Sequence, residues 1–85
     1  MMRTQVSIEN NQGLVEAFEG DTAVGKLEFD IIEGDMHIMH TYTFTGHEGK
    51  GVGKTLVKAA IAYAEGQHMG VTPVCSFAQA LMKRF

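Results

Sequence analysis

The sequence predicts an α+β fold in which a mostly antiparallel sheet is followed by two main helices. In the first half of the chain, apolar and polar residues alternate, which is the period of a strand with one buried face. After residue 53 the apolar residues recur with a helical period instead. At 85 residues the chain has room for one hydrophobic core, so residues 1–85 are expected to form a single domain.

Closely spaced turn residues divide the first half into four expected strands. Glycine, aspartate and asparagine interrupt the alternation, and these residue types accept the backbone conformations of tight turns. In the fourth strand, strict alternation places His40 on the same face as Met36 and Ile38. The expected strands, which form an antiparallel meander, are Gln5–Ile8, Leu14–Glu19, Val24–Ile32 and Met36–Phe44.

The second half begins with a long helix and a short strand. Apolar side chains recur at i, i+4 and i+7 between Lys54 and His68, and Gly70 ends this helix. Val71–Cys75 is short and largely apolar, as expected of a buried strand. Pro73 within it has no N–H for a ladder hydrogen bond, so this strand must lie at an edge, a bulge or a gap of the sheet.

A final helix is expected at the end of the chain. Ser76 is a typical N-cap residue, and Gln79 follows it at the spacing of a capping box. Lys83 and Arg84 suit the negative end of the helix dipole. The inner face of this helix is expected to consist of Phe77, Ala80, Leu81 and Phe85.

The charge balance argues against a nucleic-acid-binding protein. Ten acidic and seven basic residues give a formal net charge of -3, and no run of Lys or Arg forms a basic patch. No stretch approaches the roughly 18 continuous apolar residues of a membrane span, and residues 1–5 lack the apolar core of a signal peptide. The single cysteine, Cys75, has no partner for an internal disulfide. These features favour a soluble, cytoplasmic protein.

The most informative segment is the glycine-rich loop Gly49–Gly53, which joins an expected strand to the long helix. Its alternate glycines let the backbone turn tightly and bring bare N–H groups close to a ligand. The start of the following helix adds unpaired N–H donors and a partial positive charge, which together form a site for phosphate or pyrophosphate. The alternative is a flexible connector without a ligand. Three glycines in five residues directly before a helix favour the anion site.

The loop does not fit the two common nucleotide-binding patterns. Gly53-Lys54-Thr55 matches the end of a Walker A loop, but the first glycine of that pattern would stand where the chain has Glu48. A carboxylate at that position would face phosphates. The G-x-G-x-x-G pattern of dinucleotide-binding proteins also fails, because no glycine follows at the required spacing. A nucleotide hydrolase is therefore not expected.

The window Glu48–Gly53 does resemble the pyrophosphate-binding motif of the GNAT acyltransferase superfamily. In that motif Arg or Gln is followed three residues later by Gly and five residues later by Gly or Ala. Two further motifs resemble a branch of short GNAT-like proteins: His40-Thr41 before the loop, and an apolar-Pro-x-Cys-x-Phe run within Val71–Phe77. The resemblance extends over residues 12–85 and departs from the family at Glu48, where relatives carry Arg or Gln.

The resemblance implies a V-shaped splay between the strands Met36–Phe44 and Val71–Cys75, with the pantetheine arm of coenzyme A in the gap. It implies an acyl-CoA-dependent N-acyltransferase, with acetyl-CoA as the acyl donor and an unidentified amine as the acceptor. A non-catalytic module that binds acyl-CoA or CoA, or an interaction domain, is the alternative. The cofactor-binding residues implied are Gly49, Lys50, Gly51, Val52, Gly53 and Lys54.

Two residues are candidates for catalysis. Cys75 directly precedes a helix, a position that stabilises a thiolate, so it can accept the acyl group as a nucleophile. The alternative is an inert, buried cysteine. His40 lies on a strand that the resemblance places beside the thioester, where an imidazole can act as a general base for direct attack by the amine. The alternative there is a structural histidine, and the four histidines show no metal-ligand spacing.

Overall fold

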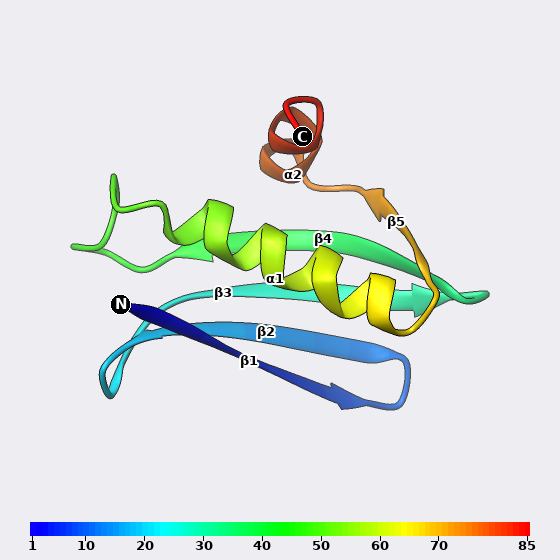
Figure 1. Ribbon diagram of the computed structural model, residues 1–85, viewed down its shortest axis with the longest axis horizontal. Helices are drawn as coiled ribbons and strands as arrows, with labels where there is room; N and C mark the ends of the chain where they lie inside the picture. Colours follow the sequence, from blue (N-terminus) through cyan, green and yellow to red (C-terminus); the bar gives the residue numbers. More distant parts are fainter.

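The computed structural model describes residues 1–85 and contains one five-stranded sheet with two helices (Figure 1). The strands lie in the order β1-β2-β3-β4-β5, with the first four antiparallel and β5 parallel to β4. The predicted α+β class and the mostly antiparallel sheet are confirmed. The elements are β1 (Met2–Glu9), β2 (Gln12–Glu19), β3 (Thr22–Ile32), β4 (Asp35–Thr43), α1 (Val52–Gly66), β5 (Gly70–Pro73) and α2 (Ser76–Met82).

Tight turns join the first four strands. Each turn contains residues with positive φ, among them Asn10 at 59°, Gly20 at 58° and Gly34 at 78°. Glycine and asparagine adopt this left-handed conformation at little cost, which is why these residues mark the turns in the sequence. The order of the strands in the sheet therefore follows their order in the chain.

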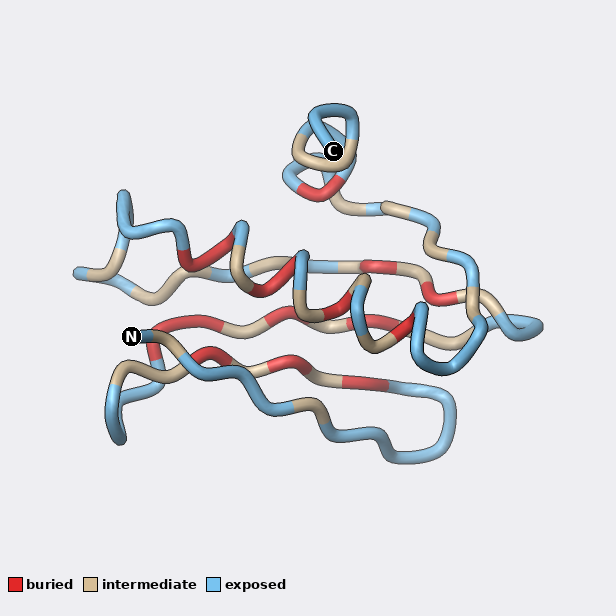
Figure 2. Tube along the Cα trace, viewed as in Figure 1, coloured by how far each residue is buried: buried red, intermediate tan, exposed pale blue.

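The core lies between α1 and one face of the sheet. Figure 2 shows the buried positions concentrated along α1 and along the strands beneath it. The largest fully buried side chains include Leu27 and Phe29 from β3, Met36 and Ile38 from β4, and Leu56 from α1. Neither helix is long and apolar enough to cross a membrane.

A one-residue irregularity in β4 changes which side chains share a face. Phe29 pairs with Ile38, but Glu28 pairs with His40, so Met39 is an extra residue in β4. Such a β-bulge shifts the alternation by one position. The expectation that His40 shares a face with Ile38 is therefore wrong, because strict alternation does not hold across the bulge.

The pairing of β5 with β4 is short and ends at the proline. Residues Asp35 to Ile38 pair with Gly70 to Pro73, after which the N–H groups of Val74 and Cys75 both donate to the Ile38 carbonyl at 2.9 and 3.0 Å. β5 is an edge strand, as the absence of an N–H on Pro73 requires. Beyond this point the chain turns away from β4 into α2 (Figure 1).

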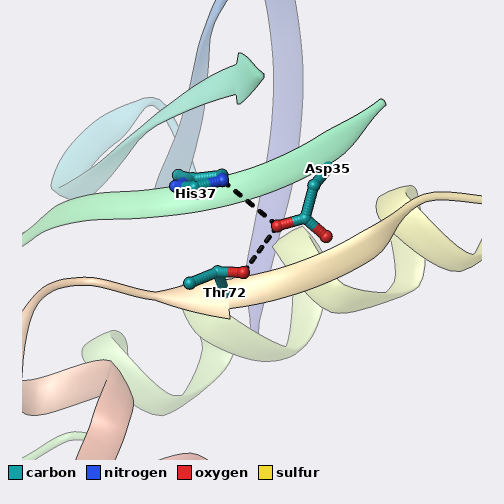
Figure 3. A network of polar contacts seen from close by, with 3 residues as sticks. All are labelled: Asp35, His37 and Thr72. Atoms are coloured by element: carbon teal, nitrogen blue, oxygen red, sulfur yellow. Dashed lines mark hydrogen bonds and ion pairs between the residues drawn. The ribbon is translucent and has the colours of Figure 1, made fainter. Parts of the chain in front are cut away.

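A polar network fastens the other end of the β4–β5 pair. Thr72 donates its hydroxyl to Asp35 Oδ2 at 2.5 Å, and His37 Nε2 lies 3.2 Å from the same oxygen (Figure 3). Asp35 and His37 belong to β4 and Thr72 to β5, so the contacts span the two strands. The strands are thus joined at one end and separate at the other.

The inner face of α2 differs from the expected one. Phe77 and Phe85 are 46% and 57% exposed, Ala80 is also exposed, and Leu81 is only partly buried. The buried residue of this helix is Ala78. The helix itself was predicted correctly. With only seven residues and a position at the margin of the sheet, it covers too little surface to bury all the apolar side chains of one face.

Gly25 allows the first turn of α1 to approach the sheet. A Cβ atom added at Gly25 would lie 2.6 Å from Val52 Cγ1 and 2.6 Å from the Tyr42 carbonyl oxygen. Its φ is not in the left-handed region, so packing and not backbone strain requires glycine here.

We expect Gly25→Ala to lower the free energy of unfolding by about 1–3 kcal/mol, the usual cost of an added methyl group in a tight core. Gly66→Ala is the matched control, because a Cβ at Gly66 meets nothing within 4 Å and the residue belongs to α1. Alanine there should raise stability by about 0.5–1 kcal/mol. Urea unfolding followed by circular dichroism measures both, and equal effects of the two substitutions would contradict the packing argument.

Candidate functional site

The loop between β4 and α1 has the backbone that its glycines predict. Gly46, Gly49 and Gly51 have φ values of 92°, 78° and 77°. A Cβ atom at any of them would meet nothing within 4 Å, so the loop is open to solvent on these sides. The glycines are therefore required by the turn itself and leave the backbone accessible to a ligand.

The start of α1 offers free N–H donors. Gly51 is its N-cap residue, no side chain caps it, and no acidic residue lies in the first turn. The first intrahelical bond runs from the Thr55 N–H to the Gly51 carbonyl at 3.0 Å, so the N–H groups of residues 52–54 have no helical partner. The exposed residues Lys50 and Lys54 add positive charge. An anion fits this arrangement because the unpaired N–H groups and the lysine ammonium groups both attract negative charge.

Glu48 is turned back onto the loop. Its Oε1 accepts a hydrogen bond from the Gly46 N–H at 2.9 Å. This contact gives the carboxylate a structural partner inside the loop, which the sequence did not indicate. The negative charge nevertheless remains within a loop that otherwise suits an anion.

The loop and the point where β4 and β5 separate are linked through α2. A Cβ atom at Gly53 would lie 2.6 Å from Phe77 Cζ, so the Phe77 ring covers the first turn of α1. Two residues earlier, Cys75 Sγ lies 3.4 Å from Thr41 Oγ1 of β4. The start of α2 therefore contacts both the first turn of α1, next to the glycine-rich loop, and β4 beyond its last pair with β5.

Cys75, and not Ser76, is the N-cap of α2. Its Sγ accepts a hydrogen bond from the Ala78 N–H at 3.3 Å. Gln79 does not complete the expected capping box, since its side-chain amide donates to the carbonyls of Pro73 and Val74 at 3.3 and 3.2 Å. The sulfur is partly buried and has two polar neighbours, so the thiol is held in one place without being sealed from solvent.

His40 and Cys75 do not form a pair. The bulge turns the exposed His40 away from α1, where its ring stacks on Tyr42 with a centroid distance of 5.8 Å. The neighbouring residue Thr41 contacts Cys75 instead. Thr41 was part of the His-Thr motif, but sequence reasoning gave it no role because the side-chain directions depend on the bulge.

A cavity of about 680 Å³ lies on the sheet face away from α1. Met39 and His40 of β4 belong to its lining, and the other lining residues come from β1, β2 and β3. Nothing in the sequence indicated this cavity, because it depends on the register of four strands. Its lining residues are Ser7, Ile8, Glu9, Gln12, Gly13, Leu14, Glu28, Phe29, Asp30, Met39 and His40.

Known proteins share this order of a glycine-rich turn followed by a helix and a short strand. A family model described as GCN5-related N-acetyl-transferase matches residues 15–85. The chain belongs to the GCN5-related N-acetyltransferase family. No curated protein sequence gives a significant match.

Solved structures of several acetyltransferases share the fold. An aminoglycoside acetyltransferase from an uncultured soil metagenomic sample has a TM-score of 0.75 at 18% identity, over 89% of this chain and 57% of its own. A ribosomal-protein-alanine N-acetyltransferase from Brucella melitensis biovar Abortus 2308 gives 0.72 at 18%, over 91% and 63%. PaiA N-acetyltransferase from Thermoplasma acidophilum, in complex with coenzyme A, gives 0.64 at 24%, over 69% and 37%. The chain thus spans about one to two thirds of the length of these three proteins.

The hydrogen bond from the Ala78 N–H to Cys75 Sγ gives Cys75 a structural role that can be tested apart from any catalytic one. We expect Cys75→Ala to lower the free energy of unfolding by about 1 kcal/mol, because the Ala78 N–H loses its acceptor. Cys75→Ser keeps an acceptor at the N-cap and should match or exceed the wild-type stability. Thermal unfolding measures both, and a serine variant as unstable as the alanine variant would show that the sulfur does not act as a cap.

Proposed function

We propose that this chain transfers an acetyl group from acetyl-CoA to an amine. The observation that supports this best is the open glycine-rich turn at the start of α1, which α2 links to the point where β4 and β5 separate through the contacts of Phe77 and Cys75. The family membership and the coenzyme A bound to the PaiA N-acetyltransferase agree with it. A free thiol persists in the reducing cytoplasm, the compartment we propose for this activity.

The loop is the part that would hold the diphosphate of the donor. Gly49 and Gly51 lie in an open turn, and the exposed residues Lys50 and Lys54 provide positive charge. Val52 and Gly53 are buried in the first turn of α1, so they would contribute backbone N–H groups only. A diphosphate there would meet backbone donors, the helix dipole and two ammonium groups together. The exposed glycines let the phosphate oxygens approach the backbone without a steric barrier.

The gap beside β4 is the part that would hold the pantetheine arm. The β4–β5 pairing ends at Ile38, so residues 39–43 have no strand partner on that side. Their free N–H and C=O groups can pair with the amides of an extended ligand, as an exposed strand edge pairs with a peptide. The side chains of Thr41 and Cys75 meet across this gap, so the arm would have to displace their contact in order to pass between them.

The chemistry we propose is direct attack by the amine. The amine nitrogen bonds to the acetyl carbonyl carbon, the thioester C–S bond breaks with its electron pair on the CoA sulfur, and the amine proton passes to His40. His40 lies next to the bulge and is exposed to solvent on the face away from α1, so it is accessible to an amine from that side. Much of the rate gain would come from holding donor and acceptor together.

The proposal is tested by adding acetyl-CoA to isotopically labelled protein and recording backbone amide shifts. Saturable shifts are expected at Gly49, Gly51 and Gly53, and along residues 39–41, because these lie along the proposed donor path. If the chemical shifts of these amides do not change at millimolar acetyl-CoA, the proposal is contradicted. Shifts without release of CoA thiol in the presence of amines would assign the chain to the binding modules instead.

The same assay tests the two candidate catalytic residues. His40→Gln should lower kcat by at least about 100-fold with little change in acetyl-CoA affinity, as expected for loss of a general base. His37→Gln is the control, because His37 contacts Asp35 at the closed end of the strand pair. An acetyl adduct on Cys75, detected by mass spectrometry before an amine is added, would replace direct attack by a route through the thiol.

Glu48 gives a further test of the loop. We expect Glu48→Gln to bind acetyl-CoA about 2- to 5-fold more tightly, since it removes a negative charge and keeps an oxygen for the Gly46 N–H. Glu65→Gln, at the opposite end of α1, removes the same charge far from the loop and should leave affinity unchanged. Calorimetric titration measures both, and equal affinities for the two variants would argue against phosphate in this loop.

A further inference from the structure

The cavity on the sheet face away from α1 opens beside the proposed site of acetyl transfer. Met39 and His40, which line it, directly follow the last residue of β4 that pairs with β5. Thr41 points the other way and contacts Cys75. A single strand segment therefore separates the cavity from the gap between β4 and Cys75. An amine that reaches His40 from the cavity lies next to that gap.

We infer that this cavity binds the acceptor, and that the acceptor is an amine with a second positive charge, such as an aliphatic diamine or polyamine. The inference rests on the proposed function, because it assigns the acceptor for the same transfer. The volume, about 680 Å³, is in the range of small-molecule sites. Its lining combines carboxylates with apolar side chains, which matches ammonium groups joined by methylene chains.

The charges of the lining favour a cation. Glu9, Glu28 and Asp30 contribute carboxylates, and neither Lys nor Arg lines the cavity. Glu28 is partly compensated, since its Oε2 lies 3.6 Å from Lys26 Nζ outside the lining. Glu9 and Asp30 have no ion-pair partner in the structure. These two carboxylates are therefore the ones available to a bound ammonium group.

The strand register places these groups on the same face of the sheet as His40. Glu9 pairs with Gln12 and Gln12 with Asp30, so the three form one row across β1, β2 and β3. His40 pairs with Glu28, and Asp30 is the next residue of β3 on the same face of the sheet. One ammonium group can thus lie in the carboxylate row while the reacting nitrogen of the same molecule lies at His40.

Apolar side chains account for the part of the ligand between its charges. Of the hydrophobic residues in the lining, Phe29 is buried in the core and Ile8 pairs with Gly13 on the α1 side of the sheet. The apolar surface available to a ligand comes from the partly exposed Leu14 and Met39. A short alkyl chain buries its methylene groups against such surface at roughly 0.8 kcal/mol per fully buried CH₂. A compact inorganic cation would leave this surface unused, so the lining favours an organic amine.

The test compares 1,4-diaminobutane with n-butylamine, which has the same carbon chain and one charge. We expect kcat/KM for the diamine to be at least about 10-fold higher. The double variant Glu9→Gln, Asp30→Asn should raise KM for the diamine about 5- to 10-fold, from two exposed ion pairs, and leave KM for butylamine within about 2-fold. Glu16→Gln is the control, because Glu16 pairs with Lys26 in β2 and β3 but does not line the cavity.

Salt gives an independent readout. The preference for the diamine should shrink as sodium chloride is raised, because these carboxylates are open to solvent and their attraction is screened. Equal kcat/KM for the two amines at low salt, or an equal effect of Glu16→Gln and the double variant, would overturn the inference.

Failure of the inference and failure of the proposed function are distinguishable. If the protein acetylates butylamine and the diamine with equal kcat/KM, the proposed acetyl transfer stands and the assignment of the cavity is wrong. If acetyl-CoA does not bind, 1,4-diaminobutane alone still tests the cavity through the amide shifts of residues 9, 12, 30 and 40. Saturable shifts there at millimolar diamine support the cation site, and their absence overturns it.

Discussion

The parallel pairing of β4 and β5 ends at Ile38 and Pro73, and the geometry of the candidate site depends on that end point. Pro73 has no N–H to continue the ladder, and the Ile38 carbonyl accepts the next two N–H groups of the chain at once. With that carbonyl satisfied, the backbone leaves the sheet and begins α2 at Cys75. The result is a strand, β4, whose second half has a free side within a folded protein.

The bulge at Met39 lies at the same place on β4 and determines what each side of the site contains. Because it adds one residue, Thr41 faces Cys75 and His40 faces the cavity. Without the bulge the two side chains would exchange faces, and the histidine would point toward the core. A single extra residue thus separates the proposed donor side from the proposed acceptor side.

The sequence predicted the fold class and the approximate strands because period two and period 3.6 are strong signals in an amphipathic chain. It also predicted the glycine-rich turn, since glycine readily accepts the positive φ values found at Gly49 and Gly51. It could not predict the face of His40, because neither Met39 nor its neighbours carry a signal for a bulge. The N-cap of α2 was misplaced by one residue, since serine has a higher N-cap preference than cysteine and the choice was decided by tertiary position.

The order of the strands also has a consequence for how the protein folds. β1 to β4 pair only with neighbours in the chain, so this meander forms from local contacts with little loss of loop entropy. β5 pairs with β4 only after α1 has crossed the sheet, over four residues, and α2 follows it. The segment that carries Cys75 is therefore the last to be held in place and the least cooperative with the rest. Local opening of β5 and α2 costs less free energy than unfolding of the meander, so the gap beside β4 can widen for a ligand while the core beneath α1 stays intact.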